Sequence, residues 1–242
     1  DGNGVNDTIG MAVSKTPWDQ LFTLKGFFNA FDSYPEIWVD DGTGKLVYGS
    51  TLPGTKDALA TLHQMYVDGL LDPEFAVKDD GKVAEATTSG KCGIMFGAQW
   101  NSIYPLQNSK NLEPEGQWQA FPIVTATDHK AKAQTDVGTT AWTVVRKDCE
   151  HPEAVVKMYN LFIDKCWGPN NENGVYYAPL DSESIWKLSP VTPTKPDKNL
   201  KAFLDLEAAR QSGDFSQVTG EGYSILQKLQ AFESGSEEGS AL

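Results

Sequence analysis

Hydrophobic residues recur at helical spacing in several stretches of the chain. The clearest stretch is 53–68, where five apolar residues share one face and Gly69 stands where a helix stops. The same periodicity predicts helices over 16–31 and 151–164. A more polar helix is expected over 79–89, and two further helices are expected over 198–214 and 218–235.

Short apolar runs bounded by glycine or polar residues predict strands between the helices. They lie at 9–15, 91–97 and 118–124, with a strand pair or one long extended segment over 136–147. The segments EIWV and KLVYG flank DDGTG, a pattern that predicts a β-hairpin. Because strands alternate with helices, the sequence predicts the α/β class.

The net charge of the chain limits the classes of macromolecule that it can bind. The formal net charge is -13 and there is no cluster of Lys or Arg. Such a chain repels nucleic-acid phosphates and anionic lipid surfaces, so neither is an expected partner. No run approaches the roughly 18 to 20 apolar residues of a membrane-spanning helix.

The sequence offers no catalytic motif. It lacks a G-x-S-x-G elbow, a phosphate-loop lysine motif and an H-E-x-x-H pair, so no enzyme is expected. The widely spaced Cys92, Cys149 and Cys166 fit neither a disulfide framework nor a zinc site. We expect buried thiols, with a Cys149–Cys166 bridge as the alternative.

Two aromatic positions are candidates for ligand binding. Trp18 follows the predicted strand 9–15, and Trp100 follows the predicted strand 91–97. In α/β sheets, ligands bind at the carboxyl ends of the strands, where an aromatic ring can stack on the apolar face of a sugar. The alternative is that both tryptophans belong to the core.

Four stretches carry a resemblance to a known family. They read DGNGVNDTIGMAVSK, TKDALATLHQMYVDGLLDPEF, SGKCGIMFGAQWN and DVGTTAWTVVRKDCEHPEAVVKMYNLF. In this order and spacing, over about 1–225, the chain resembles the family 1 extracellular solute-binding proteins of carbohydrate ABC importers. It looks like the lipid-anchored sugar-binding proteins of Gram-positive bacteria, and maltose-binding protein is a more distant relative.

The resemblance implies a set of ligand contacts. It places one stacking aromatic at Trp18, with Asp19 beside it as a polar contact. The family's second aromatic loop commonly reads G-P-W-W, and here Gln99 replaces the first tryptophan while Trp100 and the following Asn101 are kept as candidates. Tyr223 is the nearest match to a third aromatic.

The resemblance also implies an architecture. The fold is expected to be α/β of the periplasmic-binding-protein type II kind, mainly the C-terminal lobe with part of the N-terminal lobe. Residues 1–140 would form the C-terminal-lobe core, 141–190 a hinge crossing and partial N-terminal-lobe segment, and 191–242 the return helices with a frayed tail. The family's chain is longer at both ends, so we expect a fragment that binds its sugar weakly or not at all.

The function that the resemblance implies is solute capture for import. A sugar or oligosaccharide would be held between two lobes and delivered to the membrane permease of an ABC transporter. The intact protein would be an extracellular, lipid-anchored monomer that needs no cofactor, with the anchor and signal peptide outside this chain. A carbohydrate-active hydrolase, or a carbohydrate-binding or adhesion module without a transport role, are the alternatives.

The opening segment DGNGVNDTIG raises the question of calcium. Aligned with an EF-hand loop, it offers Asp1, Asn3, Val5 and Asp7 as ligands. Gly10 stands where the loop needs a bidentate glutamate, so weak calcium binding in the intact protein competes with a plain turn.

Overall fold

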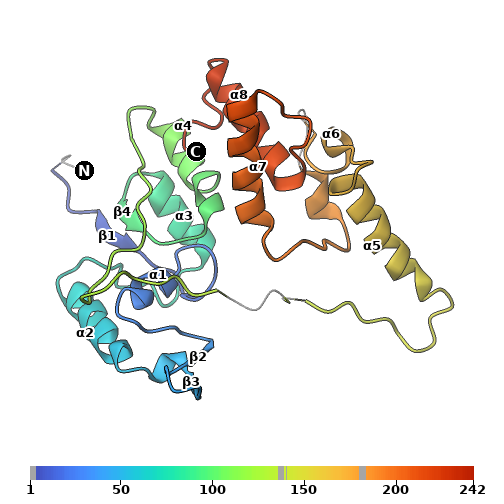
Figure 1. The fold of residues 1–242 in the computed structure, drawn as a ribbon. Coiled ribbons are helices and arrows are strands. Elements are labelled where there is room, and N and C mark those ends of the chain that lie inside the picture. Colours follow the sequence, from blue (N-terminus) through green and yellow to red (C-terminus); the bar gives the residue numbers. More distant parts are fainter. Residues whose placement is uncertain (1–3, 136–138, 140, 180–183) are drawn as a thin grey trace. The chain divides into compact units, whose positions relative to one another are not determined.

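The computed structural model describes residues 4–135, 139, 141–179 and 184–242. The chain forms two compact units: the first contains 1–136 together with 239–242, and the second contains 137–238. The second unit is thus inserted between two parts of the first. Unit 1 contains both strands and helices, whereas the described residues of unit 2 form helices and a 3-10 turn (Figure 1).

Unit 1 is built on two strands that are distant in the sequence. Strands β1 (Ile9–Ala12) and β4 (Cys92–Met95) pair in parallel, with Ile9 opposite Cys92 and Met11 opposite Ile94. Parallel pairing requires a long crossover, which the intervening helices supply. The predicted strands 9–15 and 91–97 are therefore confirmed, in shortened form.

The helices predicted over 53–68 and 79–89 are present in unit 1, which also contains a helix over 106–112 that the sequence pattern did not predict. In chain order, the helices are α1 (Lys25–Asn29), α2 (Gly54–Val67), α3 (Asp80–Thr88) and α4 (Leu106–Leu112), with 3-10 turns η1 (Gly49–Thr51) and η2 (Gln99–Ser102). The side chain of Asp79 accepts a hydrogen bond from the Lys82 backbone N–H, which caps α3. Gly69 has φ +72 just beyond α2, a left-handed conformation that glycine adopts at low cost.

The predicted hairpin is present. Strands β2 (Trp38–Asp40) and β3 (Leu46–Tyr48) pair antiparallel. In the turn, Asp40 accepts hydrogen bonds from the backbone N–H groups of Gly42 and Gly44. Both glycines have positive φ, as the tight reversal requires.

Two apolar clusters hold unit 1 together. One contains Met11, Val13, Leu24, Phe28, Ala58 and Leu71, and the other contains Ala12, Leu21, Phe22, Val83, Ala84 and Cys92. The successive β1 residues Met11 and Ala12 enter different clusters, because successive side chains of a strand point to opposite faces. The strand pair therefore separates two small cores.

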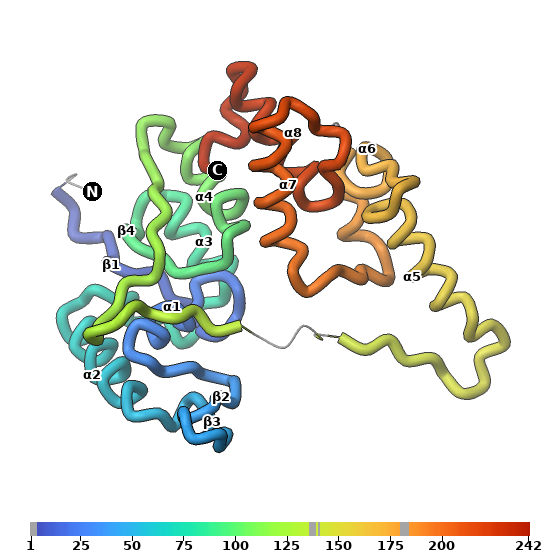
Figure 2. The backbone as a smooth tube through the Cα atoms, viewed as in Figure 1, coloured from blue at the N-terminus to red at the C-terminus, as the bar shows by residue number. Residues whose placement is uncertain are grey.

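A long segment without strands or helices, the strap (113–135), completes unit 1. Figure 2 follows it in green to yellow-green as it leaves α4 and passes α1. The Ala126 N–H donates to the carbonyl oxygen of Ala30 at 2.8 Å, which ties the strap to the end of α1. The predicted strand 118–124 is wrong: the strap contains no strand.

Unit 2 is helical in its described residues. It contains α5 (Glu153–Cys166), α6 (Asn173–Tyr176), the 3-10 turn η3 (Ile185–Leu188), α7 (Lys198–Ser212) and α8 (Gly220–Glu233). One core cluster joins Phe162, Cys166, Tyr177 and Ala178, and another joins Leu206, Ala209, Val218 and Leu226. The predicted helices 151–164, 198–214 and 218–235 are confirmed.

Two further expectations need correction. The helix expected over 16–31 is reduced to α1, because 16–24 form a turn in which Phe22 has φ +52. In the predicted extended segment 136–147, the described residues form no strand, and Trp142 and Val144 are 79% and 89% exposed. An extended segment becomes a strand only where another backbone pairs with it.

The sequence predicts buried thiols, and the structure confirms this for two of the three cysteines. Cys92 and Cys166 are buried, Cys149 is exposed, and all three are free, so the alternative Cys149–Cys166 bridge is wrong. Burial raises the pKa of both buried thiols.

Among the described residues, every helix is too short or too polar to cross a membrane. The predicted division of the chain into lobes stays a prediction.

Candidate functional site

The carboxyl ends of β1 and β4 lie at one edge of unit 1. Because the two strands are parallel, the turn after β1 and the loop after β4 leave the pair in the same direction. Open α/β sheets bind ligands at this edge. The turn (13–24) and the loop (96–102) contain five of the six residues that the sequence predicts for ligand binding.

Three hydrogen bonds join the turn to the loop. The Thr23 N–H donates to the Phe96 carbonyl oxygen at 3.1 Å, and the Ala98 N–H donates to the Gln20 carbonyl oxygen at 2.9 Å. The indole Nε1–H of Trp100 donates to Oε1 of Gln20 at 3.0 Å. The structure therefore brings Trp100 to the turn through a residue that sequence reasoning did not select.

Asn101 is the most unusual residue of the loop. It is only 5% exposed, yet neither its amide nitrogen nor its amide oxygen has a hydrogen-bond partner among the described residues. The amide lies against Gly97, where an added Cβ would come 1.5 Å from Asn101 Oδ1. A buried amide without partners costs about 1–3 kcal/mol, so this group is suited to a ligand or a water molecule.

Trp18 lies in a different environment. It packs with the cluster around Met11 and meets Phe28 edge to face at a centroid distance of 5.1 Å. It also lines a mainly apolar cavity of about 390 Å³ between the turn and α2, whose lining includes the polar groups of His63 and Tyr66. Trp100 packs on the other cluster, so the two tryptophans contact different cores.

The remaining predicted residues are spread further. Asp19 and Gln99 are exposed, and the Asp19 N–H donates to the Thr16 carbonyl oxygen within the turn. Tyr223 is on α8 of unit 2, where its hydroxyl oxygen lies 3.1 Å from the position of an added Cβ at Gly174. The role of each in binding stays a prediction.

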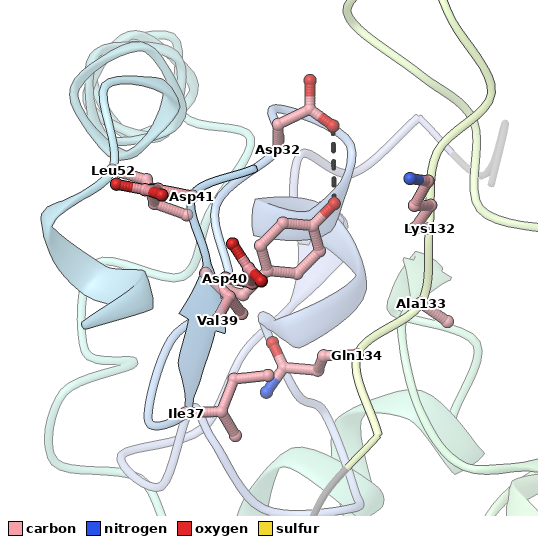
Figure 3. Close-up of a pocket in the computed structure, with 10 residues that line it drawn as sticks. Asp32, Ile37, Val39, Asp40, Asp41, Leu52, Lys132, Ala133 and Gln134 are labelled. Atoms are coloured by element: carbon pink, nitrogen blue, oxygen red, sulfur yellow. Dashed lines mark hydrogen bonds between the residues drawn. The ribbon is translucent and has the colours of Figure 1, made fainter. Parts of the chain in front are cut away.

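A second cavity, of about 450 Å³, lies beside the hairpin (Figure 3). Ten residues line it: Asp32, Tyr34, Ile37, Val39, Asp40, Asp41, Leu52, Lys132, Ala133 and Gln134. Two of its carboxylates already accept hydrogen bonds within the hairpin turn: that of Asp40 from the Gly42 N–H and that of Asp41 from the Thr43 N–H. The bond from Thr43 lowers the pKa of Asp41, so this carboxyl stays charged.

Three strap residues, Lys132, Ala133 and Gln134, line one side of the hairpin cavity. Hydrogen bonds between Gln134 and the buried Asn29 hold the strap there. Asn29 Nδ2 donates to Gln134 Oε1 at 2.9 Å, and the Gln134 N–H donates to Asn29 Oδ1 at 2.9 Å. Gln134 Nε2 also donates to the Pro35 carbonyl oxygen. These reciprocal bonds satisfy Asn29, which is 1% exposed, and hold the strap in place.

His129 fastens the strap at a second point. Its Nε2 lies 3.0 Å from the Asp32 carboxylate, and its Nδ1 lies 3.1 Å from that of Asp128. The hydrogen bonds to Asp128 and then Asp32 raise the pKa of His129 above its ordinary value of 6.5. Asp32 has φ +56, so its side chain reaches this position from a left-handed backbone.

The opening loop is described only in part. Asp1 and Asn3 lie outside the described residues, and Val5 is exposed. The Asp7 carboxylate pairs with Lys91 Nζ at 3.0 Å, which already balances its charge. No group of three acidic, histidine or cysteine residues among the described residues is placed to hold a metal. Calcium binding by the opening loop therefore stays a prediction.

Sequence reasoning missed Gln20, Asn29, Gln134 and His129. Gln20 follows the two candidates Trp18 and Asp19 in the segment directly after the predicted strand 9–15, and this position was the available signal. The pairing of Asn29 with Gln134 spans 105 positions. No local pattern announces a contact at that separation.

Comparison with protein families gives one match. A family model described as bacterial extracellular solute-binding protein matches residues 2–165. The match covers strands β1 and β4, the turn, the loop with Trp100, the strap and all of α5 except its last residue. The geometry of the strand edge and the family comparison therefore concern the same part of the chain.

Two curated relatives are similar to parts of the chain. Lipoprotein LipO of Bacillus subtilis (strain 168) is 35% identical over 102 residues, which are 39% of this chain and 19% of that protein. An uncharacterized protein in the butB 5'region of Niallia circulans is 27% identical over 133 residues, which are 50% of this chain and 52% of that protein. The chain thus spans about a fifth and about half of these relatives. No solved structure matches it.

Proposed function

Because the chain belongs to the family of bacterial extracellular solute-binding proteins, we propose that it is part of the solute-capturing component of an ABC importer. In this proposal the protein binds a solute outside the cell and releases it to a membrane permease. It performs no catalysis, because capture and release make no covalent change.

The observation that carries the proposal is the buried amide of Asn101 beside Trp100. Both residues follow β4 at the carboxyl edge of the strand pair, where α/β sheets bind ligands. The amide has a donor and an acceptor that no described residue uses, and the neighbouring indole offers an aromatic face. Together they suit a ligand with hydroxyl groups and an apolar face.

A sugar has this combination. The C–H groups of a pyranose ring present an apolar face to an indole, while its hydroxyls donate to and accept from an amide. We therefore propose a mono- or oligosaccharide as the solute, with Trp100 and Asn101 as the principal contacts. Gln99, which precedes Trp100, and Asp19, which lies in the turn that is hydrogen-bonded to the loop, are both exposed and are proposed as additional polar contacts.

The finer architecture belongs to the same proposal. In a two-lobe protein of the periplasmic-binding-protein type II kind, closure of the lobes buries the ligand and creates the form that the permease accepts. We propose that unit 1 belongs to one lobe and that the intact protein is a lipid-anchored monomer on the cell surface. The lipoprotein name of the Bacillus relative supports this location.

Saturation-transfer NMR tests the proposal, because it detects weak binding by the chain itself. Glucose, maltotriose and xylotriose serve as the sugar panel. Saturation of protein protons should transfer to the ring protons of at least one sugar. Trp100→Ala should weaken binding by about 1–3 kcal/mol, the scale of one aromatic contact.

Two variants serve as comparisons. Trp142→Ala removes an exposed tryptophan of unit 2 and should leave the transfer unchanged. Trp18→Ala distinguishes the two tryptophans: if Trp18 is only a core residue, the variant loses stability but keeps its sugar contact. If no sugar receives saturation, or if Trp100→Ala binds as well as the natural chain, the proposal is wrong.

Calcium binding in the opening loop is proposed only for the intact protein. The Asp7–Lys91 pair opposes a divalent ion, so calcium should raise the unfolding temperature of this chain little. Lys91→Met should increase the response, because it removes the lysine cation that lies 3.0 Å from the Asp7 carboxylate. A large shift in the natural chain would show instead that calcium displaces Lys91.

A further inference from the structure

The side chain of Gln20 contacts Trp100 across a separation of 80 positions. The Trp100 Nε1–H donates to Gln20 Oε1 at 3.0 Å. We propose that Gln20 is a positioning residue that sets the orientation of the Trp100 indole for ligand binding. The proposal rests on the solute-binding function proposed above, and it assigns to Gln20 a task that it performs through Trp100.

The backbone of Gln20 is fixed independently of its side chain. Its carbonyl oxygen accepts the Ala98 N–H at 2.9 Å, and this bond joins the turn to the loop directly. The side chain is exposed and is therefore not needed to fill a core. A substitution at Gln20 can remove the bond to Trp100 while the backbone contact remains.

The turn that presents Gln20 has a strained backbone. Phe22 has φ +52 and is fully buried, although a left-handed conformation is rare for a bulky residue. The turn is closed by the Leu24 N–H, which donates to the Pro17 carbonyl oxygen. A helix through this stretch, which the sequence pattern favours, would remove the turn. Such conflicts between local pattern and structure are concentrated at functional sites.

The hydrogen bond restricts what Trp100 can offer to a ligand. An indole has a single N–H donor, and in Trp100 Gln20 accepts it. The ring also packs partly on the cluster that contains Ala12 and Cys92, so part of its surface is covered. Its remaining contribution is an exposed part of the aromatic face held in a fixed plane. Polar recognition is then left to neighbours such as Asn101.

The test uses three variants of the chain. Gln20→Met keeps the length of the side chain and removes the acceptor, whereas Gln20→Glu keeps an acceptor oxygen. Trp100→Phe keeps an aromatic face and removes the donor. Gln119→Met, a change at an exposed glutamine of the strap, is the matched control.

The first measurement needs no ligand. With ¹⁵N-labelled tryptophan, each of the 7 tryptophans gives one indole N–H signal, and Trp100→Phe identifies that of Trp100 by its loss. In Gln20→Met the Trp100 signal should shift and exchange with water faster, while the other signals stay in place. Gln20→Glu should largely restore it, and Gln119→Met should not move it. An unchanged Trp100 signal in Gln20→Met overturns the proposal.

The second measurement repeats the sugar titrations with maltotriose and xylotriose. Gln20→Met should weaken binding about three- to tenfold, the effect of losing one hydrogen bond. It should have no further effect in the Trp100→Phe background, where the bond is already absent. If Trp100→Ala weakens binding but Gln20→Met does not, positioning is wrong and solute binding stands. If no sugar of the panel binds, glucose included, the proposed function fails, and the indole signal alone decides whether Gln20 orients Trp100.

Discussion

Gly220 and the indole of Trp167 fit together because Gly220 has no side chain. A Cβ at Gly220 would lie 2.1 Å from ring carbon Cζ3 of Trp167, well inside contact distance. The same glycine has φ +54, and its N–H donates to Asn173 Oδ1 at 3.2 Å. The start of α8 is therefore locked to the segment that follows α5, within unit 2.

Gly220→Ala should destabilise unit 2 by about 2–3 kcal/mol, because it combines a steric clash with a left-handed backbone. Chemical denaturation followed by circular dichroism measures the change. Gly213→Ala is the matched control: its φ is +76, but an added Cβ there meets open space. It should cost only about 1 kcal/mol, the strain alone. Equal losses in the two variants would show that the indole moves aside.

At most core positions glycine is less stable than alanine, but at Phe22 we expect the glycine variant to be at least as stable as the alanine variant. Phe22→Ala removes a fully buried ring and should cost about 3–5 kcal/mol. Phe22→Gly removes the same ring but relieves the left-handed strain, so it should be at least as stable as Phe22→Ala. Urea unfolding of both variants gives the comparison. A markedly less stable glycine variant would mean that the backbone at Phe22 carries no strain.

The contact between His129 and Asp32 should stabilise the strap only at low pH. The bonds to Asp128 and Asp32 raise the pKa of His129, so the folded state favours the charged ring. The contribution is complete below about pH 6.5 and is lost as the pH rises through the raised pKa of the folded state.

A comparison of the natural chain with His129→Gln tests this dependence. The two unfolding temperatures should differ at pH 5.5, and the difference should shrink as the pH rises through the raised pKa of His129. His63→Gln is the control, since this exposed histidine forms no ion pair with a described residue. A difference that grows toward high pH would contradict the assignment.

Glu221 joins three parts of unit 2. Its Oε2 accepts from the Tyr177 hydroxyl at 3.2 Å and from Lys198 Nζ at 2.9 Å. Burial, and then the charge of Glu221, raise the pKa of Tyr177, so its hydroxyl keeps its proton. Glu221→Ala should cost about 2 kcal/mol, because it leaves a buried hydroxyl without its acceptor.

A double-mutant cycle on thermal unfolding checks the role of Glu221. Tyr177→Phe alone should cost about 1 kcal/mol, and the double variant should cost less than the sum of the single ones. Lys201→Ala is the comparison, because its ion pair with Asp205 is more exposed and contributes less. Simple additivity would mean that the Tyr177–Glu221 bond contributes nothing.

Local signals predicted the elements that local interactions determine. α2 ends at Gly69 and α7 at Gly213, as their sequences indicate, and both glycines have positive φ. The hairpin followed from DDGTG, whose aspartates bind the turn's own backbone. In each case the deciding contact lies within a few residues, so the sequence pattern contains it.

Expectations failed where distant contacts decide. The helix predicted over 16–31 is broken because burial of Phe22 among Ala12, Val83 and Cys92 outweighs helical periodicity. The apolar residues of 141–145 favour an extended segment, but the described residues of this stretch pair with no other strand. Trp100 was selected correctly as a residue beside a strand end, whereas its partner Gln20 needed the fold to become visible.

The pairing of β1 with β4 has a consequence for how unit 1 assembles. Ile9 meets Cys92 only after the chain has wound through the hairpin, α2 and α3, so this contact closes a very long loop. The entropy of closure must be overcome before the strands gain anything from pairing, which slows folding. The edge that is proposed to hold the solute is therefore among the last parts of the unit to form, and a newly made chain acquires it only when it is nearly folded.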